Sequence, residues 1–200
     1  MFIFLFAIRN TYATEKKNFA ISTSHPVASK IGRNILNKGG NAIDAVIGTQ
    51  MALNLIEPQS SGIGGGGFLL YFDKKTSNLI FYDGREVAPS KIKKELFLDN
   101  NGNPLPFYDI AVGGTAIGVP GLVSMLEMGH QDYGLLEWKS LFKPAIKLSE
   151  NGFKISPRLY NAINKDKYLY FFPQSKKYFY KKIKLILLKQ KLIYRLLLQI

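Results

Sequence analysis

The chain has 200 residues, of which 46% are hydrophobic, so its length and composition predict a single domain with one sizeable core. It contains no cysteine, which excludes disulfide bonds and thiolate chemistry. The two histidines, His25 and His130, cannot build a closed zinc site of the usual kind without cysteine ligands. We therefore expect neither a metal nor another cofactor.

The formal net charge of +13 is concentrated near the C-terminus. Residues 165–200 hold 10 basic residues and 1 acidic residue, whereas residues 14–164 hold 16 basic and 13 acidic residues. The body of the chain is thus close to neutral, and its composition predicts no nucleic-acid partner.

Residues 1–13 (MFIFLFAIRNTYA) form an apolar run that ends in Thr-Tyr-Ala. This pattern is typical of the apolar region and small-residue cleavage site of a secretory signal, here shortened and without a basic start, because Arg9 follows the apolar run. The alternative is a buried first strand. No stretch of about 20 apolar residues occurs, so no membrane-spanning helix is expected.

Two helices are predicted next. Ser24-His25-Pro26 is a typical helix start, and Gly39-Gly40 is a typical end. Asn41 is expected to cap a second helix over residues 42–56, with Asp44 near its free N–H groups. This second helix is apolar nearly all round, which indicates a core helix.

The most informative stretch is residues 57–89. Residues 68–73 and 78–83 are rich in aromatic and aliphatic side chains and flank a polar turn, so they predict a β-hairpin. The preceding run, Gly64 to Gly67, does not fit a phosphate loop, because no Gly-Lys-Ser/Thr follows and the next element is a strand. Close backbone packing explains these glycines better.

Farther along the chain, start and stop residues predict a series of short elements. These are a helix over 90–97, a turn over 99–104, a helix from Pro120 to about Tyr133, a helix over 137–151 broken at Pro144, and a helix starting at Ser156-Pro157.

The composition changes abruptly at Lys167, after which no Gly, Ala, Val, Thr, Asp, Glu or Asn occurs. Residues 181–200, called the basic tail below, fit two interpretations. They can form a cationic amphipathic helix that binds anionic membranes, or they can be sequence read out of frame.

Arg85 is the strongest candidate for a functional side chain. It follows the hairpin beside Gly84, where it could bind an anion. Alternatively, it could form an ion pair with Asp83 or Glu86. Of these two, only Asp83 would lie on the same face of a strand as Arg85. Thr14 and the Thr23-Ser24-His25 triplet carry nucleophile-like groups, but we assign them no catalytic role.

Four motifs occur in order: SHPVASKIGRNILNKGGNAIDAVIGTQMALNLIEPQSSGIGGGGFLLYF, YDGREVAP, GVPGLVSML and LFKPAIKLSENGFKIS. Together they resemble the gamma-glutamyltransferases, also called gamma-glutamyl transpeptidases or glutathione hydrolases. The resemblance runs from about Ser24 to about Tyr180 and assigns residues 14–180 to the N-terminal part of the family's large subunit.

This resemblance implies an α+β fold, an incomplete part of the N-terminal-nucleophile hydrolase sandwich with helices packed on a β-hairpin or sheet. It also implies export to the periplasm or the exterior and a gamma-glutamyl substrate such as glutathione. In the family, a threonine exposed by self-cleavage attacks the gamma-glutamyl carbonyl, and the acyl group passes to water or an amino acid.

Residue by residue, the resemblance assigns one role: Arg85 matches the arginine that binds the α-carboxylate of the glutamyl group. No residue of this chain matches the nucleophilic threonine, which the family carries in its small subunit, so the resemblance predicts a fragment that is inactive alone. Two alternatives are a split enzyme that acts with a separately encoded small subunit and a non-enzymatic product that binds membranes through the basic tail.

Overall fold

A computed structural model of the chain describes residues 19–180. The shortened export signal (1–13) and the basic tail (181–200) lie outside the described residues, so both interpretations stay predictions. The elements in chain order are α1 (Pro26–Asn37), α2 (Ala42–Ile56), β1 (Phe68–Asp73), β2 (Asn78–Asp83), the 3₁₀ helix η1 (Lys94–Phe97), α3 (Phe107–Ala111), α4 (Leu122–Tyr133), α5 (Trp138–Asn151), α6 (Pro157–Lys165), the 3₁₀ helix η2 (Leu169–Phe171) and α7 (Pro173–Phe179).

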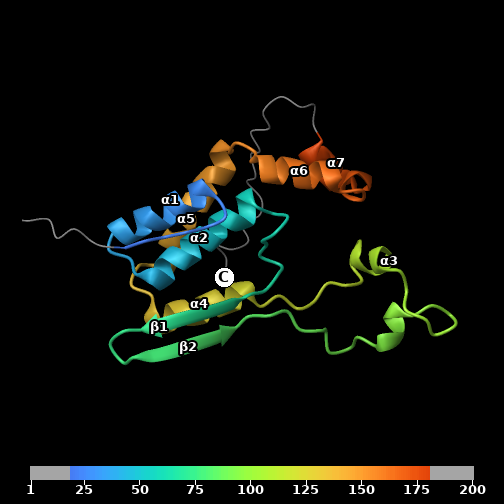
Figure 1. The fold of residues 1–200 in the computed structure, drawn as a ribbon, viewed down its shortest axis with the longest axis horizontal. Helices are drawn as coiled ribbons and strands as arrows, with labels where there is room; N and C mark the ends of the chain where they lie inside the picture. The colour runs from blue at the N-terminus through green and yellow to red at the C-terminus, as the bar shows by residue number, and fades with distance from the viewer. Residues whose placement is uncertain (1–18, 181–200) are drawn as a thin grey trace, which may run out of the picture.

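Helix α2 is the centre of the fold, as its apolar sequence predicts. It packs against α1 and α5 on one side and against α4 on another (Figure 1). Two-thirds of its 15 residues are buried, among them Ile43, Ile47 and Met51. Burial of a full aliphatic side chain contributes about 1.5 to 3 kcal/mol, so α2 supplies much of the core's stabilisation.

Strands β1 and β2 form an antiparallel hairpin with the predicted bounds, in which Phe68 pairs with Asp83 and Asp73 with Asn78. Helix α4 contacts both strands and covers the face that carries Leu69 and Tyr82. In Figure 1 the hairpin lies at the edge of the molecule, below α4 and away from α1, α2 and α5. The described chain is therefore a mixed α+β structure, with helices packed on one face of a two-stranded sheet.

Two predicted details of the helices are wrong. The expected break at Pro144 does not occur, because α5 runs through it and buries Phe142 before the proline and Ala145 after it. Packing of this continuous face against α2 outweighs the hydrogen bond that proline removes. The helix expected over 90–97 is only η1, a single 3₁₀ turn with no buried residue to hold a longer helix.

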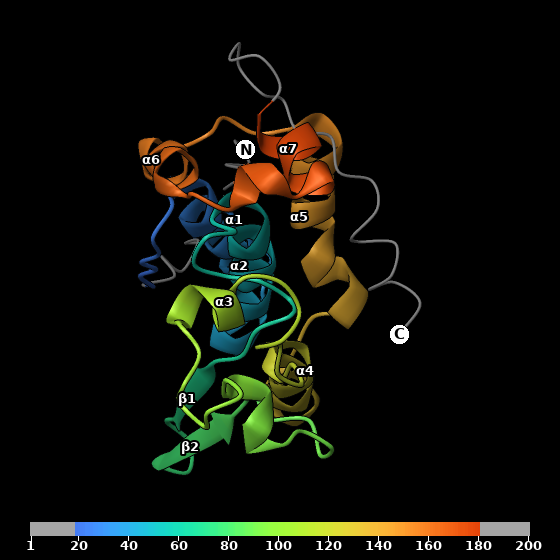
Figure 2. The same ribbon diagram turned by 90° about the vertical axis from the view of Figure 1, so that its right-hand side faces the viewer.

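Residues 88–118 form a long excursion that the sequence did not predict. It contains η1 and α3 but not one buried residue. An antiparallel bridge between Val87 and Val119 closes its base. Figure 2, turned by 90°, shows η1 and α3 in front of the hairpin and the helices, whereas Figure 1 shows them well to one side. The excursion therefore extends away from the core.

Candidate functional site

Arg85 lies just beyond the end of β2, between two fixed points of the backbone. On one side, Gly84 and Gly67 exchange two backbone hydrogen bonds of 3.0 and 3.2 Å and so extend the hairpin by one pair. On the other side, the bridge from Val87 to Val119 fixes the chain again. Arg85 is thus held in place by its backbone, and its main-chain N–H donates to Oδ1 of Asp83 at 2.9 Å.

Close backbone packing beside Arg85 explains part of the glycine-rich sequence. A Cβ atom at Gly84 would lie 2.5 Å from Cβ of Met125 in α4, and one at Gly66 would overlap the carbonyl oxygen of Gly84. Only glycine fits at these two positions. The carbonyl of Gly65 also accepts hydrogen bonds of 3.2 Å from the first N–H groups of α4, at Gly121 and Leu122. The glycine-rich loop therefore joins the hairpin to the start of α4, as the packing interpretation requires. Gly64 is an exception, because a Cβ atom added to it would have no other atom within 4 Å.

The Arg85 side chain is 68% exposed, and its Nη1 lies 3.8 Å from Oε2 of Glu86. The sequence favoured Asp83 over Glu86 as an ion-pair partner because it shares a strand face with Arg85, and this preference is wrong. The Asp83 carboxylate instead accepts the hydrogen bond from the main-chain N–H of Arg85. A surface pair at this distance contributes at most about 1 kcal/mol, so Glu86 leaves the guanidinium able to bind another anion.

Arg85 lines a hollow of about 480 Å³ at the base of the excursion. Backbone and apolar groups form most of its wall, including Val87, Pro89, Phe97 and Ile117. A planar guanidinium beside a largely apolar wall can bind a carboxylate through two parallel hydrogen bonds. The arrangement suits a small ligand with a carboxylate at one end.

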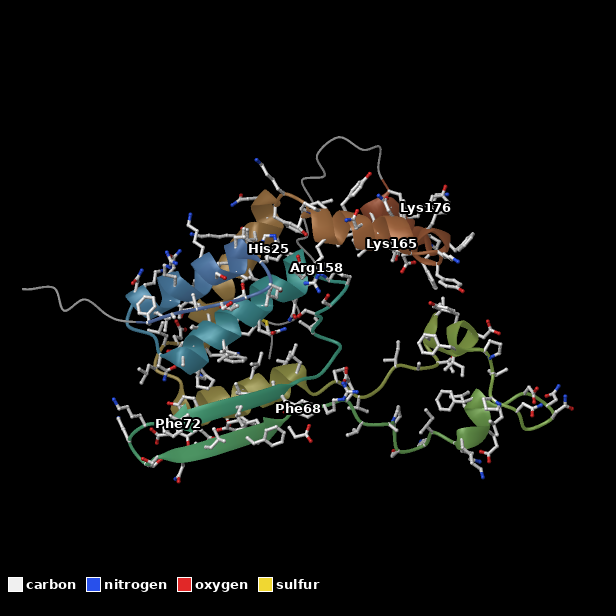
Figure 3. All side chains as sticks on the ribbon, viewed as in Figure 1. His25, Phe68, Phe72, Arg158, Lys165 and Lys176 are labelled. Carbon is white, nitrogen blue, oxygen red and sulfur yellow. The ribbon has the colours of Figure 1, made fainter. Side chains whose placement is uncertain are left out.

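A second hollow of the same volume lies between α2, the glycine-rich loop and α4. Glu57, at the end of α2, lines it and is only 1% exposed. Its carboxylate accepts hydrogen bonds from Nη1 of Arg158 at 3.0 Å, Nε2 of Gln59 at 2.7 Å and Oγ of Ser156 at 3.3 Å. Figure 3 shows Arg158 near the end of α2. No pattern in the sequence predicts this pair, because its members are 101 residues apart.

Asp44 does more than the predicted helix capping. It completes a capping box with Asn41, as expected. It is also fully buried and accepts hydrogen bonds of 3.2 to 3.4 Å from the N–H groups of Leu135 and Leu136, in the link between α4 and α5. This carboxylate therefore ties three helices together and has a structural role.

The Thr23-Ser24-His25 triplet forms a helix start and not a catalytic group. Nδ1 of His25 accepts a hydrogen bond from the N–H of Val27, which caps α1. The hydroxyl of Thr23 donates to the main-chain oxygen of His25 at 2.8 Å, so it is not directed at the imidazole ring.

Within residues 19–180, no cluster of three or more His, Asp or Glu side chains could hold a metal ion. Over the same residues, no helix has the length and apolar character needed to cross a membrane.

Comparison with known proteins decides the family. The model of the family described as gamma-glutamyltranspeptidase matches residues 28–196. The chain belongs to this family. The match includes the glycine-rich loop, the hairpin, Arg85 and the excursion.

Curated members of the family are similar over most of this chain but are much longer. The glutathione hydrolase proenzyme of Bacillus subtilis (strain 168) is 47% identical over 148 residues, which are 74% of this chain and 25% of that protein. The glutathione hydrolase proenzyme of Escherichia coli (strain K12) is 34% identical over 143 residues, 72% of this chain and 24% of that protein. The chain thus spans about a quarter of the length of these relatives.

Solved structures of the family share the fold. The gamma-glutamyltranspeptidase of Helicobacter pylori has a TM-score of 0.76 and 39% identity, and the match covers 86% of this chain and 50% of that one. The gamma-glutamyltranspeptidase of Pseudomonas nitroreducens, complexed with L-DON, has a TM-score of 0.79 and 32% identity over 87% of this chain and 51% of that one.

Proposed function

We propose that this chain supplies the carboxylate-binding part of an enzyme that transfers gamma-glutamyl groups from compounds such as glutathione. Arg85 binds the α-carboxylate of the glutamyl group, and the nucleophile comes from polypeptide outside these 200 residues. In this proposal the described α+β layers are one part of an N-terminal-nucleophile hydrolase sandwich.

One observation carries this proposal: the Arg85 guanidinium is held at a fixed backbone position, open to solvent, at the edge of a hollow. Its 3.8 Å contact with Glu86 is longer than a hydrogen bond, so its N–H donors remain available for a ligand. The family membership and the motif Asp83 to Pro89 support the choice of a glutamyl carboxylate as this ligand.

A chimeric enzyme tests the proposal. The matching 148-residue segment of the Bacillus subtilis proenzyme is replaced by the segment of this chain, and the hydrolysis of a gamma-glutamyl anilide is measured. Arg85→Gln is expected to raise KM roughly 30- to 150-fold, because a lost hydrogen bond to a charged group weakens binding by about 2 to 3 kcal/mol. The loss should disappear with a 4-aminobutyryl anilide, which lacks the α-carboxylate.

The matched control is Lys91→Gln, which removes one exposed positive charge from the same excursion and should leave KM unchanged. If Arg85→Gln affected both anilides equally, or neither, Arg85 would not be the carboxylate ligand. The purified 200-residue chain alone is expected to release no aniline from either substrate. Release above background would show that the nucleophile lies within these 200 residues.

A further inference from the structure

Arg158, in the first turn of α6, makes two hydrogen bonds with the segment that follows α2. Its Nη1 donates to Oε2 of Glu57 at 3.0 Å, and its Nη2 donates to Oγ of Ser60 at 3.0 Å. Glu57 is the last cap residue of α2, and Ser60 lies three residues farther along the chain. A rigid planar guanidinium can hold both acceptors at once. Arg158 therefore fixes the start of the segment that leads into the glycine-rich loop.

The carboxylate side of this anchor is buried. The side chain of Glu57 is only 2% exposed, whereas that of Arg158 is 55% exposed. A carboxylate at this depth is stable only when a cation and hydrogen-bond donors replace its lost hydration. Ser156 supplies one such donor, and its Oγ also accepts a hydrogen bond from the N–H of Leu159, which caps α6. Arg158 and the start of α6 are therefore both bound to the buried carboxylate.

Beyond Ser60, further hydrogen bonds continue the anchorage toward the hairpin. Oγ of Ser61 accepts a hydrogen bond from Nε2 of Gln50 at 2.6 Å and donates to Oδ1 of Asn54, both in α2. The carbonyl of Gly65 accepts a hydrogen bond of 3.2 Å from the N–H of Gly121 at the start of α4. The segment over residues 57–67 is thus attached to α6, α2 and α4 in turn.

The end of this segment lies directly against the backbone that carries Arg85. A Cβ atom at Gly66 would overlap the carbonyl oxygen of Gly84 and would lie 2.8 Å from the main-chain nitrogen of Glu86. These two groups flank Arg85 on both sides. Because contacts this close leave no free space, a shift of the loop must also shift the backbone of Arg85.

We propose that Arg158 is a positioning residue for Arg85: through Ser60 it fixes the glycine-rich loop, against which the backbone of Arg85 rests. Figures 1 and 2 both show α6 at the end of the molecule away from the hairpin. Arg158 therefore acts through the loop and not by contact with the ligand of Arg85. The inference rests on the proposed function, because it takes the glutamyl α-carboxylate as that ligand.

Hydrogen exchange of the full 200-residue chain tests the structural step without any substrate. The reporters are the amides of Gly65 and Gly67, which donate hydrogen bonds to the carbonyls of Gly62 and Gly84. Arg158→Gln is expected to speed their exchange roughly 10-fold, the factor expected when a hydrogen bond to a charged group is lost. Exchange in the middle of α2 should stay the same. Equal acceleration in α2 and the loop would show a general loss of stability and overturn the inference.

A chimeric enzyme tests the consequence for the carboxylate site. It carries residues 28–180 of this chain, which lie within the family match, in place of the corresponding segment of the Bacillus subtilis proenzyme. Arg158→Gln is expected to raise KM for the gamma-glutamyl anilide roughly 10- to 100-fold, because a displacement of about 1 Å in a binding group can cost about 100-fold. KM for the 4-aminobutyryl anilide, which lacks the α-carboxylate, should not change. The control Arg33→Gln removes an exposed arginine from α1 and should leave both KM values unchanged.

Two further variants separate positioning from the effect of an unpaired buried charge. Ser60→Ala keeps the pair of Arg158 with Glu57 and removes only the link to the loop, so it should raise KM for the gamma-glutamyl anilide roughly 3- to 10-fold. The double variant Glu57→Gln/Arg158→Gln removes the unpaired charge but not the loss of the link. It should therefore keep a raised KM. Normal KM values in both of these variants would overturn the inference, even if Arg158→Gln did not fold.

The outcomes also separate this inference from the proposed function. Residues that act through one group are not additive, so Arg158→Gln should add nothing to the KM of Arg85→Gln. If Arg85→Gln acts selectively on the gamma-glutamyl anilide while Arg158→Gln raises KM for both anilides or for neither, only the positioning inference is wrong. If Arg85→Gln is not selective, the proposed function fails, and faster exchange confined to the loop would still establish Arg158 as the anchor of the loop.

Discussion

Replacement of Asp44 by alanine tests whether this side chain only caps α2 or also holds three helices together. The carboxylate is fully buried and accepts hydrogen bonds from the N–H groups of Asn41, Leu135 and Leu136 at 3.0 to 3.4 Å. Asp44→Ala leaves all three N–H groups without this acceptor at once. Of these partners, Asn41 belongs to the cap of α2, and the other two belong to the link between α4 and α5.

The two roles predict different magnitudes. Loss of a helix cap alone destabilises a protein by about 1 kcal/mol. Each buried N–H group left without an acceptor adds about 1 to 3 kcal/mol. With two such groups in the α4–α5 link, Asp44→Ala is expected to lower the free energy of unfolding by about 3 to 7 kcal/mol, a large share of the roughly 5 to 15 kcal/mol of a typical domain.

Urea unfolding followed by far-UV circular dichroism measures this difference, provided that the slope with denaturant stays the same. The control is Glu127→Ala, which removes an exposed carboxylate from α4 and should change the free energy of unfolding by less than about 0.5 kcal/mol. A loss of only about 1 kcal/mol for Asp44→Ala would refute the role in joining the helices and leave capping as the whole contribution.

Two further substitutions test the hairpin. Gly84→Ala should destabilise the protein by about 1 to 3 kcal/mol, because the new Cβ would lie 2.5 Å from Cβ of Met125, whereas Gly64→Ala, with open space around it, should have little effect in the same urea assay. Tyr82→Phe should reduce the loss of stability at alkaline pH. Burial and the 2.6 Å hydrogen bond to Asp132 raise the pKa of the Tyr82 hydroxyl above its usual 10.0. The stabilisation that the protonated hydroxyl provides is therefore present below pH 10, and it is lost as the pH rises through the higher pKa of the folded state. Identical pH profiles for the variant and the unchanged chain between about pH 9 and 11 would contradict this.

The sequence predicted elements well where the signal is local. The bounds of α2 follow from the cap at Asn41 and the end of its apolar run, and the hairpin follows from two apolar strands around a polar turn. Pro144 misled the prediction because its effect on α5 is also local, whereas the packing that overrides it comes from α2.

Long-range contacts were beyond prediction for the same reason. The pair of Glu57 with Arg158 and the contact of Asp44 with Leu135 join residues about 90 to 100 positions apart, and no residue pattern links such positions in one sequence. For Arg85, the residue could be singled out from the sequence, and its proposed ligand rests on the resemblance. Only the structure shows that Arg85 is exposed at the edge of a largely apolar hollow.

This exposure decides how strongly Arg85 can act. A guanidinium with 68% of its side chain exposed is well hydrated, and a carboxylate that binds it there gains at most about 1 kcal/mol. Two unit charges 4 Å apart attract about four times more strongly at an effective dielectric constant of 20 than in bulk water. A ligand that displaces this water as it enters the hollow beside Arg85 would therefore be bound more strongly than at an open surface. Within the described residues, the apolar side chains that contribute to such low-dielectric surroundings are those of the hollow's wall, among them Val87, Phe97 and Ile117.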